Sequence, residues 1–441
     1  MLLNKDRSEV IAFIGVTFVI LLIYVCFGMA SYTAKNGPLT FDSRFLTDPV
    51  TSDYYNNLAK SFYEGRLDVT ETRGELDLIA FNSKKYLLWP PVPAIVLMPI
   101  VAIFGTDLPD RLINAILGSM NVFLFMLILK KIRQRYHFQF LKSTTIIALG
   151  IFWALGTVHF WMSLAGTVWL ISQIMAQTFL FAAICVLLDT DKKITTYLFA
   201  GLWFGLAVYT RNDLVFSGIF MAVLIYEDFQ GAIINPRLLK SLGTFSVFFV
   251  VFSLLNLEYN YLRFGNAFDN GANYHLMGET FKAKFAQWGY LSTHYIPHNL
   301  YYEVFKMPEL TNSPPFIVTD FEGFGLLWVS PLFLLIFPSV YFLIRKFRKS
   351  QGTKAMMSNG SLMIGAAMIT IIPIAFTIFT VMGTGEFQFG ARYTLDFHIF
   401  LCLLLLPVID AFSDMKWFRF LCAGLIAISC CINAIGIFLY Y

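Results

Sequence analysis

Charged residues are scarce in this chain. Asp, Glu, Lys and Arg make up only 14% of its 441 residues, whereas 57% are hydrophobic and the mean hydropathy is +0.66. Soluble domains carry roughly a quarter charged residues. A water-soluble fold could not bury so much apolar surface. The composition therefore predicts an all-α, polytopic protein of the cell membrane.

Cysteines in a metal-binding arrangement are also lacking, as is a strong excess of one charge. The net charge is only +4, and the basic residues form short clusters, which indicate topology rather than nucleic-acid binding. No cofactor is expected, although a divalent metal is left open. All six cysteines lie inside apolar runs, which is typical of buried hydrophobic side chains: Cys26, Cys185, Cys402, Cys422, Cys430 and Cys431.

The basic clusters orient the chain in the membrane. Lys5 and Arg7 precede the first apolar run, which predicts a cytoplasmic N-terminus. Later clusters are assigned to the same side, at 130–135, 191–193, 235–240, 345–349 and 415–419. The apolar runs then predict about 11 spans, with the N-terminus in and the C-terminus out. These spans are 10–31, 110–130, 143–162, 166–188, 195–210, 212–228, 241–257, 325–344, 360–381, 394–412 and 418–440.

One apolar stretch is left out of this count. Residues 89–105 contain four prolines and only a short clean run, so we predict a helix that lies in the outer interface or re-enters from it. The whole chain, 1–441, is predicted to be a single membrane domain without tandem repeats. Two long segments then lie outside, a first outer loop at 32–109 and a second at 258–324.

A polar, acidic and aromatic stretch follows the first span, at 47–65. Ser52 or Asp53 can cap a helix that begins at Tyr54. An apolar stripe follows at helical spacing, which predicts a face turned to the membrane: Tyr55, Leu58 and Phe62. The pattern indicates an amphipathic interfacial helix with Asp53 at its start. The alternative is that Asp53 only caps the helix.

Several segments, taken in order, resemble a known family. The first are "LAKSFYEGRLDV", "PPVPAIVLMPIVAIFG" and "RLINAILGSMNVFLFMLILKKIRQR". Later ones are "GLWFGLAVYTRNDLVF", "NYLRFGNAFDNGANY", "GFGLLWVSPLFLL" and "FGARYTLDFHIFLCLLL". Together they are similar to integral-membrane glycosyltransferases of the GT-C fold, in the superfamily of protein O-mannosyltransferases and lipid A aminoarabinose transferases. The resemblance covers most of the chain.

The resemblance implies a sugar donor carried on a polyprenyl phosphate and a catalytic acid in the first outer loop. Asp53 matches the family acid by position, with Asp48 and Asp42 as upstream alternatives. Aminoarabinose transferases have a lysine directly before the Pro-Pro pair. This chain has Trp89 there, with Lys84 and Lys85 as the nearest lysines, and Lys85 is the candidate for substrate binding.

Glycosyl transfer also needs cations that stabilise the leaving phosphate. Arg392 in "GARY" and Arg211 in "TRND" lie at predicted span ends, where charges are costly and often functional. Tyr393, next to Arg392, is a further candidate for substrate binding. Both arginines can instead snorkel to the interface, and Asp213 can simply pair with Arg211. Tyr54, Tyr55, Trp89 and Trp288 can stack on sugar or prenyl groups, although interfacial anchoring is the commoner role of such aromatics.

Two patterns suggest a metal site but are explained better without one. Residues 75–77, "ELD", look like a short acidic motif, and a solvated loop is the favoured interpretation. His294 and His298 lie four residues apart, as metal ligands on a helix can, but no third ligand is in view. A polar loop face is therefore preferred.

These observations predict a glycosyltransferase, a hexosyl or pentosyl transferase that moves a sugar from a polyprenyl-phosphate donor to an acceptor hydroxyl outside the cytoplasm, with inversion. The acceptor is a glycan, a lipid or a protein, and no nucleic acid is involved. A transporter or flippase of lipid-linked sugar is the main alternative, and a non-catalytic protein that binds polyprenyl lipid is a third. Transporters place ionisable groups near the midplane, often in repeated halves, whereas the notable charges here gather on one side.

Overall fold

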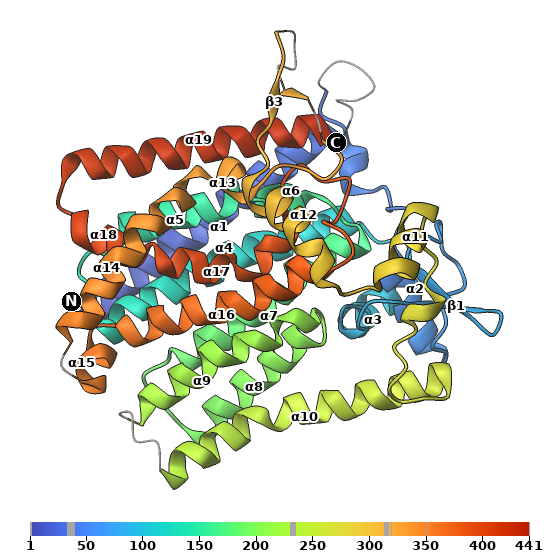
Figure 1. The fold of residues 1–441 in the computed structure, drawn as a ribbon, viewed down its shortest axis with the longest axis horizontal. Coiled ribbons are helices and arrows are strands. Elements are labelled where there is room, and N and C mark those ends of the chain that lie inside the picture. The colour runs from blue at the N-terminus through green and yellow to red at the C-terminus, as the bar shows by residue number, and fades with distance from the viewer. Residues whose placement is uncertain are drawn as a thin grey trace.

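The computed structural model describes residues 2–32, 40–229, 235–312, 317–318, 320–350 and 352–440. Helices that run lengthwise through the molecule form a bundle (Figure 1). Residues 40–109 and 258–312 gather at one end of it, which we call the loop end. Helix α1 begins at the opposite end, and α19 runs toward the loop end (Figure 1).

Seven helical segments in the described part of the chain are long and apolar enough to cross a membrane. They comprise α1 (Leu2–Ser31), α4 (Asp110–Tyr136), α7 (Val168–Leu187), α10 (Pro236–Phe264), α16 (Ser361–Thr380), the run of η7 (Arg392–Thr394), α17 (Leu395–Leu404) and α18 (Leu406–Phe412), and α19 (Lys416–Tyr440). The apolar window of α7 is 89% buried, whereas those of α1, α10 and α19 are 17%, 17% and 22% buried. Helix α7 is therefore central, and the other three are peripheral.

Shorter or broken helices occupy the remaining predicted spans. The span at 143–162 is divided into α5 (Ser143–Leu155) and α6 (His159–Leu164). The span at 325–344 is divided at Pro331, because proline lacks the N–H that a continuous helix needs. The other pieces are α8 (Ile194–Val208), η2 (Asn212–Phe216), α9 (Ser217–Asp228), α13 (Leu326–Val329), η6 (Pro331–Leu335), α14 (Ile336–Lys349) and α15 (Thr353–Ser358). The predicted count of 11 spans and their orientation stay predictions.

The loop end contains short elements, including strands. Two antiparallel hairpins, β1 (Leu78–Phe81) with β2 (Lys84–Leu87) and β3 (Glu309–Leu310) with β4 (Ile317–Val318), show that the fold is not strictly all-α. The helical elements are η1 (Ser43–Leu46), α2 (Tyr54–Tyr63), α3 (Val92–Phe104), η3 (Ala272–Tyr274), α11 (Glu279–Trp288), η4 (Thr293–Tyr295), α12 (Ile296–Leu300) and η5 (Tyr301–Phe305). Helix α3 has only 13 residues, too few to span a bilayer.

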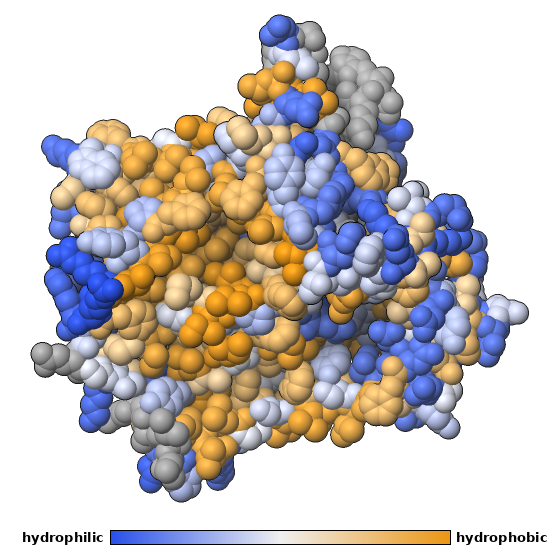
Figure 2. All heavy atoms as spheres, viewed as in Figure 1, coloured by the Kyte–Doolittle hydropathy of each residue, from blue (hydrophilic) through white to orange (hydrophobic). Residues whose placement is uncertain are grey.

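The surface matches a membrane protein. Hydrophobic side chains cover the middle of the face in Figure 2, and hydrophilic ones gather at both ends, most of all at the loop end. Large apolar side chains on the peripheral helices are exposed, such as Phe18 on α1, Leu254 on α10 and Phe420 on α19. In water such a surface would be unfavourable, because each buried Å² of apolar area contributes roughly 25 cal/mol. The protein is therefore a multi-pass helical membrane protein.

The apolar stripe of α2 corrects one prediction. Tyr55 and Leu58 are buried at 2% and 0% exposure, and Phe62 is partly buried. They pack in a cluster with α3 and with Val168 and Ile171 of α7, so the stripe faces protein rather than lipid. Both surroundings are apolar, and the sequence pattern alone does not distinguish them. This packing fixes the start of α2 against the start of α7.

Candidate active site at the loop end

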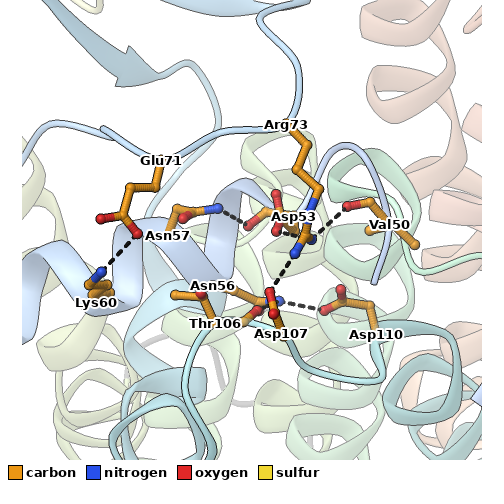
Figure 3. A network of polar contacts seen from close by, with 10 residues as sticks. All are labelled: Val50, Asp53, Asn56, Asn57, Lys60, Glu71, Arg73, Thr106, Asp107 and Asp110. Atoms are coloured by element: carbon orange, nitrogen blue, oxygen red, sulfur yellow. Dashed lines mark hydrogen bonds and ion pairs between the residues drawn. The ribbon is translucent and has the colours of Figure 1, made fainter. Parts of the chain in front are cut away.

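Asp53 lies directly before α2 and is only 4% exposed. Its Oδ2 forms an ion pair with Nη1 of Arg73 at 2.7 Å, and the other terminal nitrogen of Arg73 binds Asp107 (Figure 3). The carboxylate makes no capping hydrogen bond to α2, although the backbone carbonyl of Asp53 accepts the amide of Asn56. The prediction that this side chain caps the helix is therefore wrong, while the predicted position of Asp53 at the helix start is confirmed.

The surroundings of Asp53 suit a general base. Burial raises the pKa of its carboxyl to about 6, Arg73 opposes this rise, and the charge of Asp107 adds to it. A base works best when its pKa is near the working pH and it is still ionised. The Oδ1 atom is buried and has no hydrogen-bond partner among the described residues, so it retains free acceptor capacity.

A second buried carboxyl adjoins Asp53 and was not singled out from the sequence. Asp110, in the first turn of α4, is 2% exposed and accepts a hydrogen bond from Nδ2 of Asn56 at 2.9 Å (Figure 3). The same amide donates to the carbonyl of Thr106 at 3.1 Å. Asn56 is on α2, so this contact ties the helix that starts at Asp53 to the start of α4.

The two alternative acids have different partners. The carboxylate of Asp48 accepts a hydrogen bond from the hydroxyl of Tyr32 at 2.7 Å. Asp42 caps η1 through the amide of Arg44 and forms an ion pair with the same residue at 2.6 Å. Neither carboxylate is buried as Asp53 is. Asp53 therefore combines burial, a raised pKa and an oxygen without a hydrogen-bond partner among the described residues. Asp48 and Asp42 are less buried, and Tyr32 and Arg44 bind their carboxylates.

Arg392 and Arg211 lie together around Tyr393. Their guanidinium carbons are 5.3 Å and 5.5 Å from the centre of its ring. Arg211 is held by carboxylates: Nη2 lies 2.5 Å from Asp396, and Nε lies 3.5 Å from Asp213, which confirms the predicted pair with Asp213. The charge of Arg211 is therefore already balanced inside the protein.

Arg392 differs from Arg211 in this respect. It is 7% exposed, and it makes no ion pair with any carboxylate in the described ranges. Its Nε is buried without a hydrogen-bond partner there. A Cβ atom at Gly385 would lie 2.6 Å from that nitrogen, so glycine permits this close approach. An arginine with unused donors can bind an anion such as phosphate in two-point contact.

Helix α7 brings the two sets of groups together. The amide of Val168 donates to the carbonyl of Ser52, the neighbour of Asp53, at 3.2 Å. Nε2 of Gln173 donates to the carbonyl of Arg392 at 3.1 Å. These two positions of α7 are separated by roughly 8 Å along the helix axis. The segments that carry the candidate base and Arg392 are thus hydrogen-bonded to the first turns of one helix.

Tyr54 and Lys85 have partners within the protein. Tyr54 is 1% exposed, and its hydroxyl donates to the carbonyl of Leu76 at 3.0 Å. Burial, followed by the charges of Asp77 and Asp53, raises its pKa to about 12. Lys85 projects from β2 and pairs with Glu75 at 2.5 Å. Their predicted contacts with substrate stay predictions.

The two metal-like patterns have ordinary partners. Asp77 accepts hydrogen bonds from Trp169 at 3.0 Å and pairs with His275 at 2.9 Å. His294 stacks on Trp288 with ring centres 4.0 Å apart. His298 instead contacts Glu322 at 2.7 Å. No group of three or more potential metal ligands occurs among the residues that the structure describes.

Sequence reasoning missed Arg73, Asp110 and a buried glutamate, Glu303. Asp110 carried a usable signal, since an acid in the first turn of an apolar helix is stabilised by the helix dipole. Arg73 is one basic residue in a polar loop, 20 residues after Asp53, and no local pattern connects the two. Glu303 likewise has no sequence signal, because its burial depends on the fold.

Comparison with known proteins gives structural similarity only. No family model matches the chain, and no curated protein matches it. The structure is similar to that of ArnT from Cupriavidus metallidurans bound to undecaprenyl phosphate, with 12% identity, a TM-score of 0.45, and coverage of 98% of this chain and 75% of that one.

It is also similar to the oligosaccharyltransferase of Archaeoglobus fulgidus in the apo form, with 12% identity and a TM-score of 0.49. This match covers 97% of the present chain but 56% of the other, so the chain spans just over half of that enzyme's length. A further structure, archaeal AglB from the same organism with an inhibitory peptide and a dolichol-phosphate, gives 12% identity, a TM-score of 0.49 and coverage of 97% and 55%. These scores lie below 0.5, so the function is argued from the site itself.

Proposed function

We propose that the protein is a membrane glycosyltransferase that moves a sugar from a polyprenyl-phosphate donor to an acceptor hydroxyl. One observation carries this proposal. Among the residues that the structure describes, a buried carboxylate with a free oxygen and an arginine without a carboxylate partner lie on segments that are hydrogen-bonded to the same end of α7 in a membrane protein. A base and an anion-binding cation are the two polar parts that this reaction needs.

In the proposed reaction, Oδ1 of Asp53 takes the proton of the acceptor hydroxyl. The acceptor oxygen attacks the anomeric carbon, and the bond between that carbon and the phosphate oxygen breaks with its electron pair. The polyprenyl phosphate leaves with the additional negative charge, which the guanidinium of Arg392 stabilises. A single displacement inverts the anomeric centre. Asp53 must later release its proton to water.

The roles of the surrounding residues follow from their contacts. Arg73 pairs with both Asp53 and Asp107. It therefore favours the ionised form of Asp53 without giving that carboxylate its whole charge. Arg211 balances Asp396 and holds one face of Tyr393, so we assign it a positioning role. The sugar, the acceptor (glycan, lipid or protein) and the extracytoplasmic location of the site belong to the proposal.

A transfer assay tests the proposal. Purified protein is given a radiolabelled polyprenyl-phosphate sugar together with envelope extract as the acceptor source. The proposal predicts that the labelled sugar is transferred from the polyprenyl lipid to an acceptor in the extract. Sugar-free polyprenyl phosphate should be released in an amount equal to the sugar transferred. Loss of this transfer in Asp53→Asn, with donor binding retained, would support the assigned base. No transfer with any of several donor sugars would count against the function.

A further inference from the structure

A buried glutamate near Arg392 has no assigned function. Glu303 lies within η5 and is 1% exposed. Both of its carboxyl oxygens are buried, and neither has a hydrogen-bond partner among the described residues. Burying such a group without partners is unfavourable, because its hydrogen bonds to water are lost and not replaced. A purely structural position would be served better by an apolar side chain, so the carboxyl group needs another explanation.

The backbone around Glu303 is unusual and well fixed. Segment η5 is a π-helix, a rare conformation that is frequent at functional sites. The amide of Lys306 closes it on the carbonyl of Tyr301 at 2.7 Å. A Cβ atom at Gly325 would lie 2.5 Å from the backbone of Val304, so only glycine permits this packing without a shift. Glu303 is thus held in a defined place.

That place is beside the candidate phosphate site. Segment η5 packs against η7, the turn that begins with Arg392. Burial raises the pKa of Glu303 well above its usual range, and the charges of Arg392 and Arg211 only partly oppose this. Glu303 nevertheless forms no ion pair with either arginine in the described structure. A neutral carboxyl group offers one donor and one acceptor.

The chain that follows Gly385, the glycine that lies against Arg392, is strained. Glu386 and Phe387 have φ angles of 37° and 48°, in the left-handed region that residues other than glycine seldom adopt. Such strain is found where ligands are gripped or where segments switch. Arg392 therefore lies against the start of a strained segment, and the turn that it begins packs against the segment that holds Glu303.

We propose that Glu303 contacts the donor sugar when its phosphate is bound at Arg392, by donating one hydrogen bond and accepting one from adjacent sugar hydroxyls. This inference rests on the proposed function and assigns to Glu303 the recognition of the donor sugar. Adjacent hydroxyls can each donate and accept, so they match the two oxygens of Glu303. The phosphate itself needs cations, and the prenyl chain offers no hydrogen bonds, which leaves the sugar as the partner. Both oxygens are buried in the protein without bound lipid, so binding of the lipid-linked sugar must move neighbouring side chains to reach them.

Binding of two lipids separates this role from a structural one. The probes are undecaprenyl phosphate and undecaprenyl-phosphate mannose or glucose, titrated into the purified protein in detergent. For Glu303→Met we expect unchanged affinity for the sugar-free lipid and a Tm that is equal or higher. Of the two sugar-bearing lipids, the one that wild type binds more tightly is compared. Its affinity for Glu303→Met should be lower by about tenfold to a hundredfold, the effect of two lost hydrogen bonds. Glu303→Gln keeps a donor and an acceptor and should stay within about threefold of wild type.

The control variant is Glu309→Met, because Glu309 lies in the same segment of the chain and is exposed. It should leave both affinities unchanged. Equal losses for both lipids in Glu303→Met, or none, would overturn the inference, and so would a Gln variant as weak as the Met variant. If wild type transfers sugar and Glu303→Met binds both lipids as wild type does, only the role of Glu303 is overturned. Absence of transfer in wild type counts against the proposed function, while the ratio of the two affinities still tests Glu303.

Discussion

Replacing Asp53 by asparagine should stop sugar transfer and make the protein more stable. The pKa of Asp53 rises from 3.8 to about 6 in the folded protein. Each unit corresponds to 1.36 kcal/mol, so the ionised carboxylate destabilises the folded state by about 3 kcal/mol relative to its neutral form. Asparagine has nearly the same size and remains neutral. Arg73 keeps Asp107 as its partner, so we expect a net gain of about 1–3 kcal/mol at pH 7.5.

The sign of this effect depends on pH. Between pH 3.8 and about 6 the folded protein holds a proton on Asp53 that the unfolded chain has lost, so stability declines as the pH rises through this window. The advantage of Asp53→Asn should therefore be full above pH 6 and disappear below pH 4. Thermal unfolding in detergent at several pH values measures it.

Activity should change in the opposite direction. Removal of a general base typically lowers the rate by about a hundredfold to ten-thousandfold. Asp48→Asn is the matched control, because the carboxylate of Asp48 is bound by Tyr32 and lies outside this network. Near-normal transfer by Asp53→Asn, or a lower Tm than wild type at pH 7.5, would refute the reasoning. In that case Asp48 is the next candidate for the base.

Three other predictions use the neighbouring charges. Arg73→Gln should move the acid limb of the pH–activity profile, expected near pH 6 in wild type, to higher pH, because Arg73 lowers the pKa of Asp53. If the limb does not move, it does not report the titration of Asp53. Arg392→Lys should weaken donor binding by about tenfold to a hundredfold despite the retained charge, because the two-point geometry is lost; wild-type affinity in a folded variant would remove this role. Arg211→Gln should instead destabilise the fold by about 3–5 kcal/mol, since it leaves the carboxylate of Asp396 buried without its partner; a stable variant with selective loss of donor binding would show that Arg211 contacts the donor.

The topology has its own test. In a protein without its native cysteines, a cysteine at Ser83 or Asn273, both exposed at the loop end, should react with an impermeant thiol reagent from outside. The matching inside position, Gln351, lies outside the described residues, and a cysteine there should react only after permeabilisation. The reverse pattern would contradict the assigned side of the site.

The central helices were predictable because their apolar runs are long and uninterrupted. The predicted spans 166–188 and 360–381 end within two residues of α7 and α16. The break between α5 and α6 was missed because Thr157 is a small polar residue in an apolar run. Its hydroxyl donates to Trp153 and accepts from the amide of His159, which satisfies the freed backbone groups. Hydropathy averaged over a window does not detect such local compensation.

The site was predictable only in part, for the same reason. The position of Asp53 at the start of a helix follows from the residues around it. Its partner Arg73 and the carboxyl group of Glu303 are brought in by tertiary packing, and no spacing rule connects them with Asp53 or Arg392. Ion pairing distinguishes the two arginines, and only the fold shows it: Arg211 is balanced by the buried carboxylate of Asp396.

Sugar transfer by this protein is tested most directly by following both products of the reaction in proteoliposomes. Protein is reconstituted with a polyprenyl-phosphate sugar labelled in the sugar, and a soluble acceptor hydroxyl compound is supplied from outside. We predict that label leaves the lipid, that sugar-free polyprenyl phosphate appears in equal amount, and that Asp53→Asn does neither. Label that stays on the lipid but changes leaflet would contradict the account, because it would identify a flippase rather than a transferase.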